Sequence, residues 1–427
     1  MLLMVMLFGC LFLGLPIFIA MLMPSVYYLV GEMSMPAFLS VQIFLQALSR
    51  NSMLCIPFFM LAASVMGKGQ IGPRLLKFAR SIVGHMHGGM ALTTILTCCI
   101  IGAISGQANA GILIIGAMML KEMTENGYDK FFSAGLICTV SAVGMLIPPG
   151  NAFVIYATNT NTSVIRLFLA GAGAGVLYGI VFMVYSYIYA RRKKIPLSPR
   201  ATLGEFCTSL IEARWALGLP LIIGGTMYTG ICSPTEASGL AAAYAILVEM
   251  FVYREIKFKG LVDIIVNCSK HVASVYVLLA AGTVLGYTMT VARIPQLMEA
   301  LLGSSSRIEM LLIINLMFLI AGCFMGPGSA IVIIIPMVFQ VAMKTGIDPI
   351  HLGAIVITNI TIGMATPPFG ASLFHSCRVM RMTFSEMVWS TLPFILLMLV
   401  ILAIVTFVPA VSLFLPNLVL GPAAGVM

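Results

Sequence analysis

The sequence predicts an all-α polytopic membrane protein with about ten transmembrane helices and two re-entrant hairpins, arranged as two inverted-topology repeats. Three observations predict this fold: the chain is strongly apolar, two of its segments resemble each other, and its positive charges collect on one side. Of the 427 residues, 60% are hydrophobic and 9% are charged, and the mean hydropathy is +1.08. A soluble domain carries about 25% charged residues, so the chain belongs in a lipid bilayer.

The internal repeat holds a constant offset of 219 residues, as from Pro148 to Pro367. Each copy begins at a Gly-x-Asp turn (127–129 and 346–348), continues as an apolar run and ends in a Pro-Pro pair. Apolar matches arise easily in such a chain, whereas matched Gly, Pro and Asp residues do not. Paired Gly and Pro interruptions in corresponding membrane segments are typical of secondary transporters and indicate the binding site.

The first repeat is assigned to residues 1–190, with a hairpin at about 88–122 and a broken span at about 130–158. Residues 102–111 are small, polar and rich in Gly, which makes a poor helix interior. Backbone leaves a helix at membrane depth only where protein or a water-filled cavity covers it. One long span is the alternative for 88–122, but a hairpin with its tip at Ser105–Asn109 fits the pattern better.

The second repeat is assigned to residues 214–427, after a cytoplasmic linker at 191–213 that is rich in Arg and Lys. It contains a hairpin at about 308–344, with its tip at 326–329, and a broken span at about 349–377. The remaining spans are expected at about 2–23, 35–49, 53–67, 163–190, 215–231, 237–253, 271–291 and 385–412, with an amphipathic helix at 71–86.

The positive charges test this topology. With the N-terminus outside, 18 of the 23 Lys and Arg residues lie inside, as the positive-inside rule requires. The five outside are Arg50, Arg166, Arg293, Arg307 and Lys344. Reading both hairpins as full spans would move the basic cluster at 191–194 to the side of the N-terminus. The net charge of +9 therefore follows the membrane topology, and no nucleic-acid partner is expected.

The breaks predict two Na⁺ sites, because broken helices free carbonyl oxygens that can coordinate a cation beside hydroxyl groups. The first site comprises Ser105, Gly106 and Asn109, facing Gly144 and Pro148. The second comprises Gly326, Gly328 and Ser329, facing Thr361, Gly363 and Thr366. Neither tip contains Asp or Glu, which favours Na⁺ coupling through neutral oxygens over a proton relay. The structural alternative is that these residues only let helices pack or kink.

The substrate is expected between the two ion sites, where half-helix N–H groups can hold a carboxylate. The residues predicted to contact it are Pro149, Gly150, Asn151, Pro368 and Gly370. No organic cofactor is expected.

A family resemblance rests on several motifs taken together. The run Gly230 to Ala237, with Ser233-Pro234-Thr235-Glu236, resembles the G-x-x-T/S-P-T-E-A signature of the large membrane subunit (DctM/SiaM-like) of tripartite ATP-independent periplasmic (TRAP) transporters. Ile56 to Ala62 resembles that family's I-P-F-F-x-L-A, and both Pro-Pro breaks also match. Pro234, Thr235 and Glu236 are interpreted as a structural turn in which Glu236 caps the following helix.

The resemblance implies an elevator-type, Na⁺-coupled importer of a small organic acid anion, a carboxylate or sugar acid, and not an enzyme. It implies a multi-pass protein of the bacterial inner membrane, with both termini periplasmic on the topology above. Its partners would be a small membrane subunit (DctQ/SiaQ-like) and a periplasmic substrate-binding protein. Many family members carry an acid in each tip and this chain does not, so the substrate does not follow from the family. The alternatives are a stand-alone divalent-anion/Na⁺ symporter, against which the Pro-Thr-Glu-Ala signature argues, and a non-transporting membrane subunit.

Overall fold

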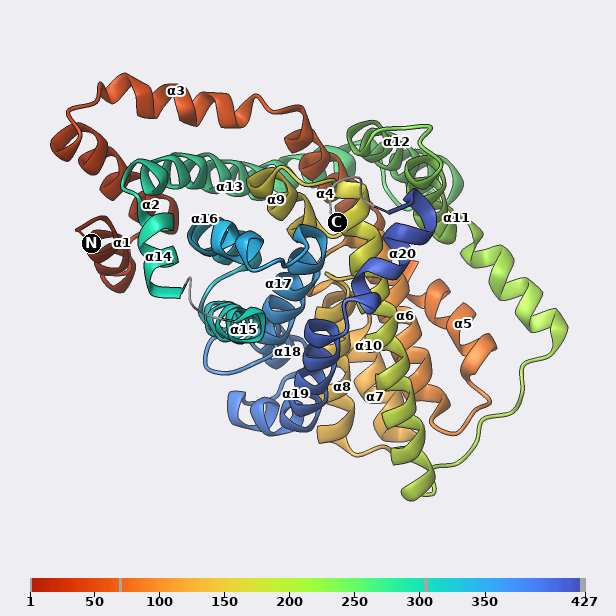
Figure 1. The fold of residues 1–427 in the computed structure, drawn as a ribbon. Helices are drawn as coiled ribbons and strands as arrows, with labels where there is room; N and C mark the ends of the chain where they lie inside the picture. The colour runs from red at the N-terminus through yellow and green to blue at the C-terminus, as the bar shows by residue number, and fades with distance from the viewer. Residues whose placement is uncertain (1, 69–70, 303–305, 423–427) are drawn as a thin grey trace.

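The computed structural model describes residues 2–68, 71–302 and 306–422. Over these ranges the chain is all-helical, without strands, which confirms the predicted fold class. In Figure 1, α1 and α2 lie at one end of the molecule, and α5 and α11 at the other. The long helix α13 (Phe258–Val291) runs beside α3 (Ala37–Leu48) along one edge and also packs against α16 (Pro327–Lys344).

The helices follow one another with few long connections, apart from short π and 3-10 segments. The first ten are α1 (Leu2–Phe12), α2 (Ile17–Tyr27), α3 (Ala37–Leu48), α4 (Cys55–Met66), α5 (Ile71–Val83), α6 (Gly89–Ser105), α7 (Ala117–Glu125), α8 (Lys130–Val143), α9 (Asn151–Thr160) and α10 (Val164–Arg192). The rest are α11 (Leu203–Tyr228), α12 (Pro234–Leu247), α13 (Phe258–Val291), α14 (Ile294–Leu302), α15 (Arg307–Phe324), α16 (Pro327–Lys344), α17 (Pro349–Met364), α18 (Ala371–Met380), α19 (Phe384–Phe407) and α20 (Ala410–Leu420).

The same order of elements occurs twice: a short arm, a hairpin, a broken span and a long helix. It runs from α5 to α10 and again from α14 to α19. The repeated turn has a local cause, since Gly127 and Gly346 both take a positive φ, 86° and 75°. Asp129 then caps α8, because its carboxylate accepts a hydrogen bond of 3.0 Å from the Phe132 N–H. Asp348 caps α17 in the same way, by accepting a hydrogen bond of 2.7 Å from the Ile350 N–H.

Three details differ from the sequence-based expectation. The single span predicted for 2–23 is wrong, because the helix stops at Phe12 and restarts at Ile17 around Gly14, at φ 75°, and Pro16. Seven described helices are long and apolar enough to cross a membrane alone, and two of them, α15 and α16, are the arms of the second hairpin. Only five of the ten predicted spans are therefore single long helices, and the other five are shorter or interrupted helices. The linker predicted for 191–213 is partly helical, since α11 begins at Leu203.

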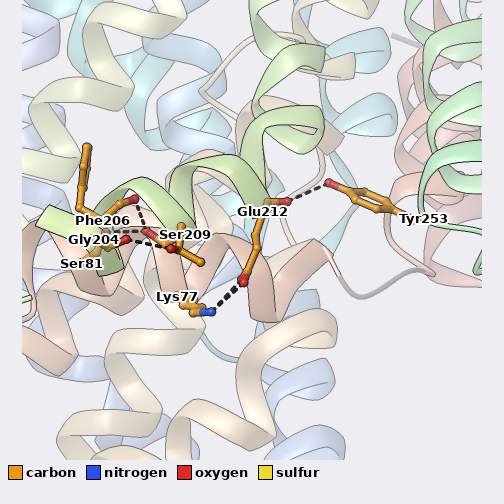
Figure 2. A network of polar contacts seen from close by, with 8 residues as sticks. Lys77, Ser81, Gly204, Phe206, Ser209, Glu212 and Tyr253 are labelled. Atoms are coloured by element: carbon orange, nitrogen blue, oxygen red, sulfur yellow. Dashed lines mark hydrogen bonds and ion pairs between the residues drawn. The ribbon is translucent and has the colours of Figure 1, made fainter. Parts of the chain in front are cut away.

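The amphipathic helix predicted for 71–86 is present as α5, and its polar face contacts protein. Figure 2 shows Lys77 directed at Glu212 of α11, with a Nζ–carboxylate distance of 2.9 Å. One turn further along α5, the Ser81 hydroxyl lies 3.0 Å from that of Ser209. The Tyr253 hydroxyl donates to the Glu212 carbonyl at 3.2 Å, which ties the region after α12 to α11. The arm is therefore fastened to the part of the chain that begins the second half.

Candidate functional site

Each hairpin crosses its broken span at a pair of glycines. In the first half Gly102 of α6 lies against Gly144, the residue that ends α8. In the second half Gly322 of α15 lies against Gly363 of α17, where a methyl group on Gly322 would sit 3.2 Å from the Gly363 Cα. Residues without a side chain are needed here because the two backbones are in contact. The crossings bring together the C-terminal ends of α6 and α8, and of α15 and α17.

The first predicted ion site lies just beyond the first crossing. Gly106 ends α6 in the left-handed conformation, at φ 59°, and faces the Pro149 carbonyl so closely that a Cβ atom would overlap it. The Ser105 hydroxyl accepts a hydrogen bond from the Gln107 N–H at 3.3 Å. Asn109 turns elsewhere, because its Oδ1 accepts a hydrogen bond of 2.8 Å from Ser372 of α18. The structure therefore brings Ser105 and Gly106 to the first break, while Asn109 joins the two halves.

The second predicted ion site lies at the corresponding place in the second half. Thr361 and Thr366 flank the end of α17, and their hydroxyls donate to the carbonyls of Ile357 (2.8 Å) and Ile362 (2.7 Å). Each threonine oxygen keeps lone pairs that can accept or coordinate. Gly326 precedes α16, whose first turn contains Gly328 and the buried Ser329.

A cavity of about 300 Å³ separates the two hairpin tips, and we call it the tip cavity. Its described lining residues are Gly106, Gln107, Ala108, Asn109, Met145, Asn151, Ala152, Ile155, Val275, Leu278, Gly326, Pro327, Gly328, Ser329 and Met364. None of these is charged. Both tips, the start of α9 and the middle of α13 thus meet at one place, and of the residues predicted for the substrate Asn151 lines this space.

Two helices begin at the wall of the tip cavity. Asn151 is the first residue of α9 and Pro327 the first of α16, and both line the space. The free N–H groups and positive dipole of a helix N-terminus favour an anion. The Asn151 Oδ1 is buried and has no hydrogen-bond partner within the described ranges. A ligand in the cavity can therefore meet the N–H donors of two helix N-termini without any charged side chain.

Other residues predicted for the substrate lie beside this cavity rather than on its wall. Pro149 and Gly150 join the halves of the first broken span, and Pro368 and Gly370 those of the second. Both Pro-Pro peptide bonds are cis. Gln107 of the predicted tip, and Met145 and Met364 at the two breaks, also line the cavity although they were not assigned to the site. Val275 and Leu278 were not predicted, because no motif distinguishes an apolar helix face that meets a tip only in the folded chain.

The Ser-Pro-Thr-Glu turn holds two scaffold helices together. Glu236 accepts a hydrogen bond from the Ser233 N–H at 2.8 Å, and the Glu236 N–H donates to the Ser233 hydroxyl at 3.3 Å, which forms a capping box at the start of α12. The Thr235 hydroxyl donates to the Asn51 carbonyl at 3.2 Å and lies 3.4 Å from the Cys55 Sγ. The turn therefore positions α12 against α4, its principal packing partner.

The fold and the tip cavity define a polytopic membrane transporter with paired hairpins and broken spans. The family described as "Tripartite ATP-independent periplasmic transporter, DctM component" matches residues 4–411. The chain belongs to this family and is a large permease of the TRAP transporter class, which confirms the resemblance.

Curated relatives agree with this assignment, and a solved structure shares the fold. The C4-dicarboxylate TRAP transporter large permease protein DctM of Pseudomonas aeruginosa is 40% identical over 86% of each chain. The sialic acid TRAP transporter large permease protein SiaM of Vibrio cholerae is 32% identical over 97% of each. The crystal structure of the Alcanivorax borkumensis YdaH transporter has the same fold, with a TM-score of 0.61 over 86% of each chain at 14% identity.

Proposed function

We propose that the chain imports a small organic acid anion, a carboxylate or sugar acid, together with Na⁺. The tip cavity carries this proposal, because both hairpin tips and two helix N-termini line it and none of its described lining residues is charged. Such a site holds an anion through N–H dipoles, and a nearby cation compensates the remaining charge. The relatives named for C4-dicarboxylates and for sialic acid support this class of substrate.

Sodium coupling follows from the polarity of the helices. At each glycine crossing two helices end, and the negative end of the helix dipole favours a cation. Backbone carbonyls at these ends, with the hydroxyls of Ser105, Thr361 and Thr366, are neutral oxygen donors that suit Na⁺. Cations at the helix C-termini and an anion at the N-termini of α9 and α16 stabilise each other. This arrangement makes binding of the acid dependent on Na⁺.

Transport by an elevator mechanism would move the hairpins and broken spans as one body against α3, α4, α12 and α13. The support for this is the mixed wall of the tip cavity, where Val275 and Leu278 of α13 face residues of both tips. A disulfide between a hairpin tip and α13 should stop transport if this body moves. Full-rate uptake with the cross-link formed would reject the mechanism.

Two partners complete the proposal. A small membrane subunit would cover part of the large permease, and a periplasmic binding protein would deliver the acid. In this proposal both termini of this chain lie on the periplasmic side, which the positive-inside pattern supports.

The test is uptake by proteoliposomes that contain this chain, its small subunit and its binding protein. A panel of labelled organic acids is offered with and without an inward Na⁺ gradient. The proposal predicts uptake of at least one acid that needs both Na⁺ and the binding protein. Uptake by this chain alone would contradict the three-part mechanism and favour a stand-alone symporter.

A further inference from the structure

One face of α13 lines three cavities in succession. Ile264, Asn267 and His271 face the first, Val275 and Leu278 face the tip cavity, and Gly282, Gly286 and Thr290 face the third. Steps of three or four residues keep all of them on one side of the helix. From residue 264 to residue 290 the helix rises about 39 Å at 1.5 Å per residue. This exceeds the hydrocarbon thickness of about 30 Å, so α13 is long enough for the three cavities to be spaced along a path across the membrane.

The third cavity, at the far end of α13, is the most polar of the three. It has a volume of about 540 Å³ and lies between α3, the end of α9, α13 and α16. We call it the Arg50 cavity, because Arg50 is the only charged residue among its described lining residues. Its polar side chains include Gln42, Gln46, Asn159, Tyr287 and Gln340. Amide and hydroxyl groups of this kind can donate hydrogen bonds to a carboxylate and also accept them from substrate hydroxyls.

Arg50 is fixed at the wall of this cavity with spare donors. Its Nη1 donates to the Thr158 carbonyl at the end of α9, at 3.0 Å. A guanidinium has five N–H groups, so most of them stay available to a ligand. None of the ion pairs found among the described residues includes Arg50. A cation without an acidic partner in a polar hollow attracts anions and binds carboxylates well.

The Arg50 cavity is separated from the tip cavity by apolar contacts. Gly282 of α13 is packed tightly against Val332 of α16. A Cβ atom on Gly328 would lie 3.3 Å from the Leu278 Cδ2 and 3.4 Å from the Ile155 Cδ1. The second hairpin thus closes the route between two spaces that share α9, α13 and α16.

We propose that the Arg50 cavity is a second anion-binding site, which holds the carboxylate of the substrate before it enters the tip cavity. The proposal rests on the proposed function for the identity of its ligand, an organic acid. In this proposal the acid is first bound on the outer side of the membrane, where the positive-inside pattern predicts Arg50. The close packing of Gly282 against Val332 must loosen before the acid moves inward.

The first test needs no transport. The purified full chain with Gln46→Cys is labelled with two methanethiosulfonate reagents, the anionic sulfonatoethyl reagent and the cationic trimethylammonioethyl reagent. The labelling of the parent chain is subtracted from each rate. The measured quantity is the ratio of the anionic to the cationic labelling rate. This ratio should be about tenfold higher at Gln46→Cys than at Thr229→Cys, a control position at the end of α11. Arg50→Gln in the same chain should remove this preference. Equal preferences at the two positions, with or without Arg50, would overturn the proposal.

The second test uses uptake of whichever acid the panel identifies. Arg50→Gln should raise KM about tenfold, the effect of losing one charge-assisted hydrogen bond, and leave the maximal rate unchanged. Arg50→Lys should recover much of the loss, and Arg293→Gln, another outward cation, should have no effect. A fall in maximal rate at constant KM would show a structural role and overturn the proposal.

The two tests separate this site from the proposed function. Charge-selective labelling at residue 46 without Na⁺-coupled uptake would keep the anion site and reject the function. Na⁺-coupled uptake with an unchanged KM in Arg50→Gln would keep the function and reject the site.

Discussion

The two hairpins cross their broken spans in the same way, at Gly102 and Gly322, but they end in different tips. The first tip ends in the left-handed Gly106 and is tied through Asn109 to Ser372 in the other half. In the second tip Met325 and Gly326 stay extended, and α16 begins directly at Pro327. The crossing is thus a requirement of the fold that both halves share. The tips have diverged, so that one joins the halves and the other presents a helix N-terminus to the tip cavity.

The largest expected effect comes from removing the shared crossing. Gly102→Ala and Gly363→Ala would place a methyl group against backbone atoms that cannot move aside, and should each lower stability by about 3 kcal/mol. The measurement is the thermal unfolding midpoint in detergent, together with the yield of monodisperse protein. Gly239→Ala is the control, since its Cβ meets open space and the change should gain up to about 1 kcal/mol. Equal midpoints for all three variants would contradict the crossing.

The next effect compares the ion sites of the two halves. Ser105→Ala and Thr366→Ala should each raise the Na⁺ concentration for half-maximal uptake about tenfold, because each removes one coordinating oxygen. Thr366→Ser keeps the hydroxyl and should stay close to the parent. Membrane insertion should be normal in every variant. Unchanged Na⁺ dependence in both alanine variants would reject the ion-site assignment, and unequal shifts would show which half binds Na⁺ more tightly.

A smaller effect tests the contact found only at the first tip. A double-mutant cycle of Asn109→Ala and Ser372→Ala should give a coupling free energy of about 1 kcal/mol, as expected for one partly buried hydrogen bond. The readout is again the unfolding midpoint. The control cycle combines Asn109→Ala with Ser376→Ala, one turn further along α18. The effects of these two substitutions on stability should be additive. Additivity in both cycles would mean that Asn109 does not join the halves.

The smallest effect concerns the arms, which are fastened differently in the two halves. Lys77 ties α5 to Glu212 of α11, whereas Lys344 of α16 pairs with Glu299 of α14 at 2.6 Å. Both lysines are more than half exposed, so Lys77→Gln and Lys344→Gln should each cost about 0.5 kcal/mol or less. The losses should disappear at high salt. A loss above 1 kcal/mol that persists in salt would show that an arm holds its half together.

The repeated features were predictable because their causes are local. Gly127 needs a positive φ, Asp129 caps a helix and the Pro-Pro pair interrupts one, whatever surrounds them. Such residues revealed both broken spans, and the Gly-rich interruptions at 102–111 and 326–329 revealed both hairpins. Gly14 and Pro16 carried the same kind of signal, but the apolar run around them was read as one span, and the structure divides it there.

The tip cavity could be predicted only in part. The tip residues Gly106 and Gly326 were expected at this place because they interrupt helices. Leu278 and Val275 were not, because they lie on an ordinary face of α13 and reach the tips only through tertiary packing. Asn109 was assigned to an ion site from its place in the chain, and its bond to Ser372 depends on a contact 263 residues away.

The central claim is that Na⁺ and an organic acid meet between the two hairpin tips, and Gly326→Cys tests it most directly. This residue lines the tip cavity and has open space where its side chain would stand. The measurement is the rate at which N-ethylmaleimide labels the new thiol, with the acid identified by uptake, with Na⁺, with both or with neither. The account predicts that acid and Na⁺ together slow labelling at least tenfold, whereas the acid without Na⁺ does not. An unchanged rate under all four conditions would contradict it.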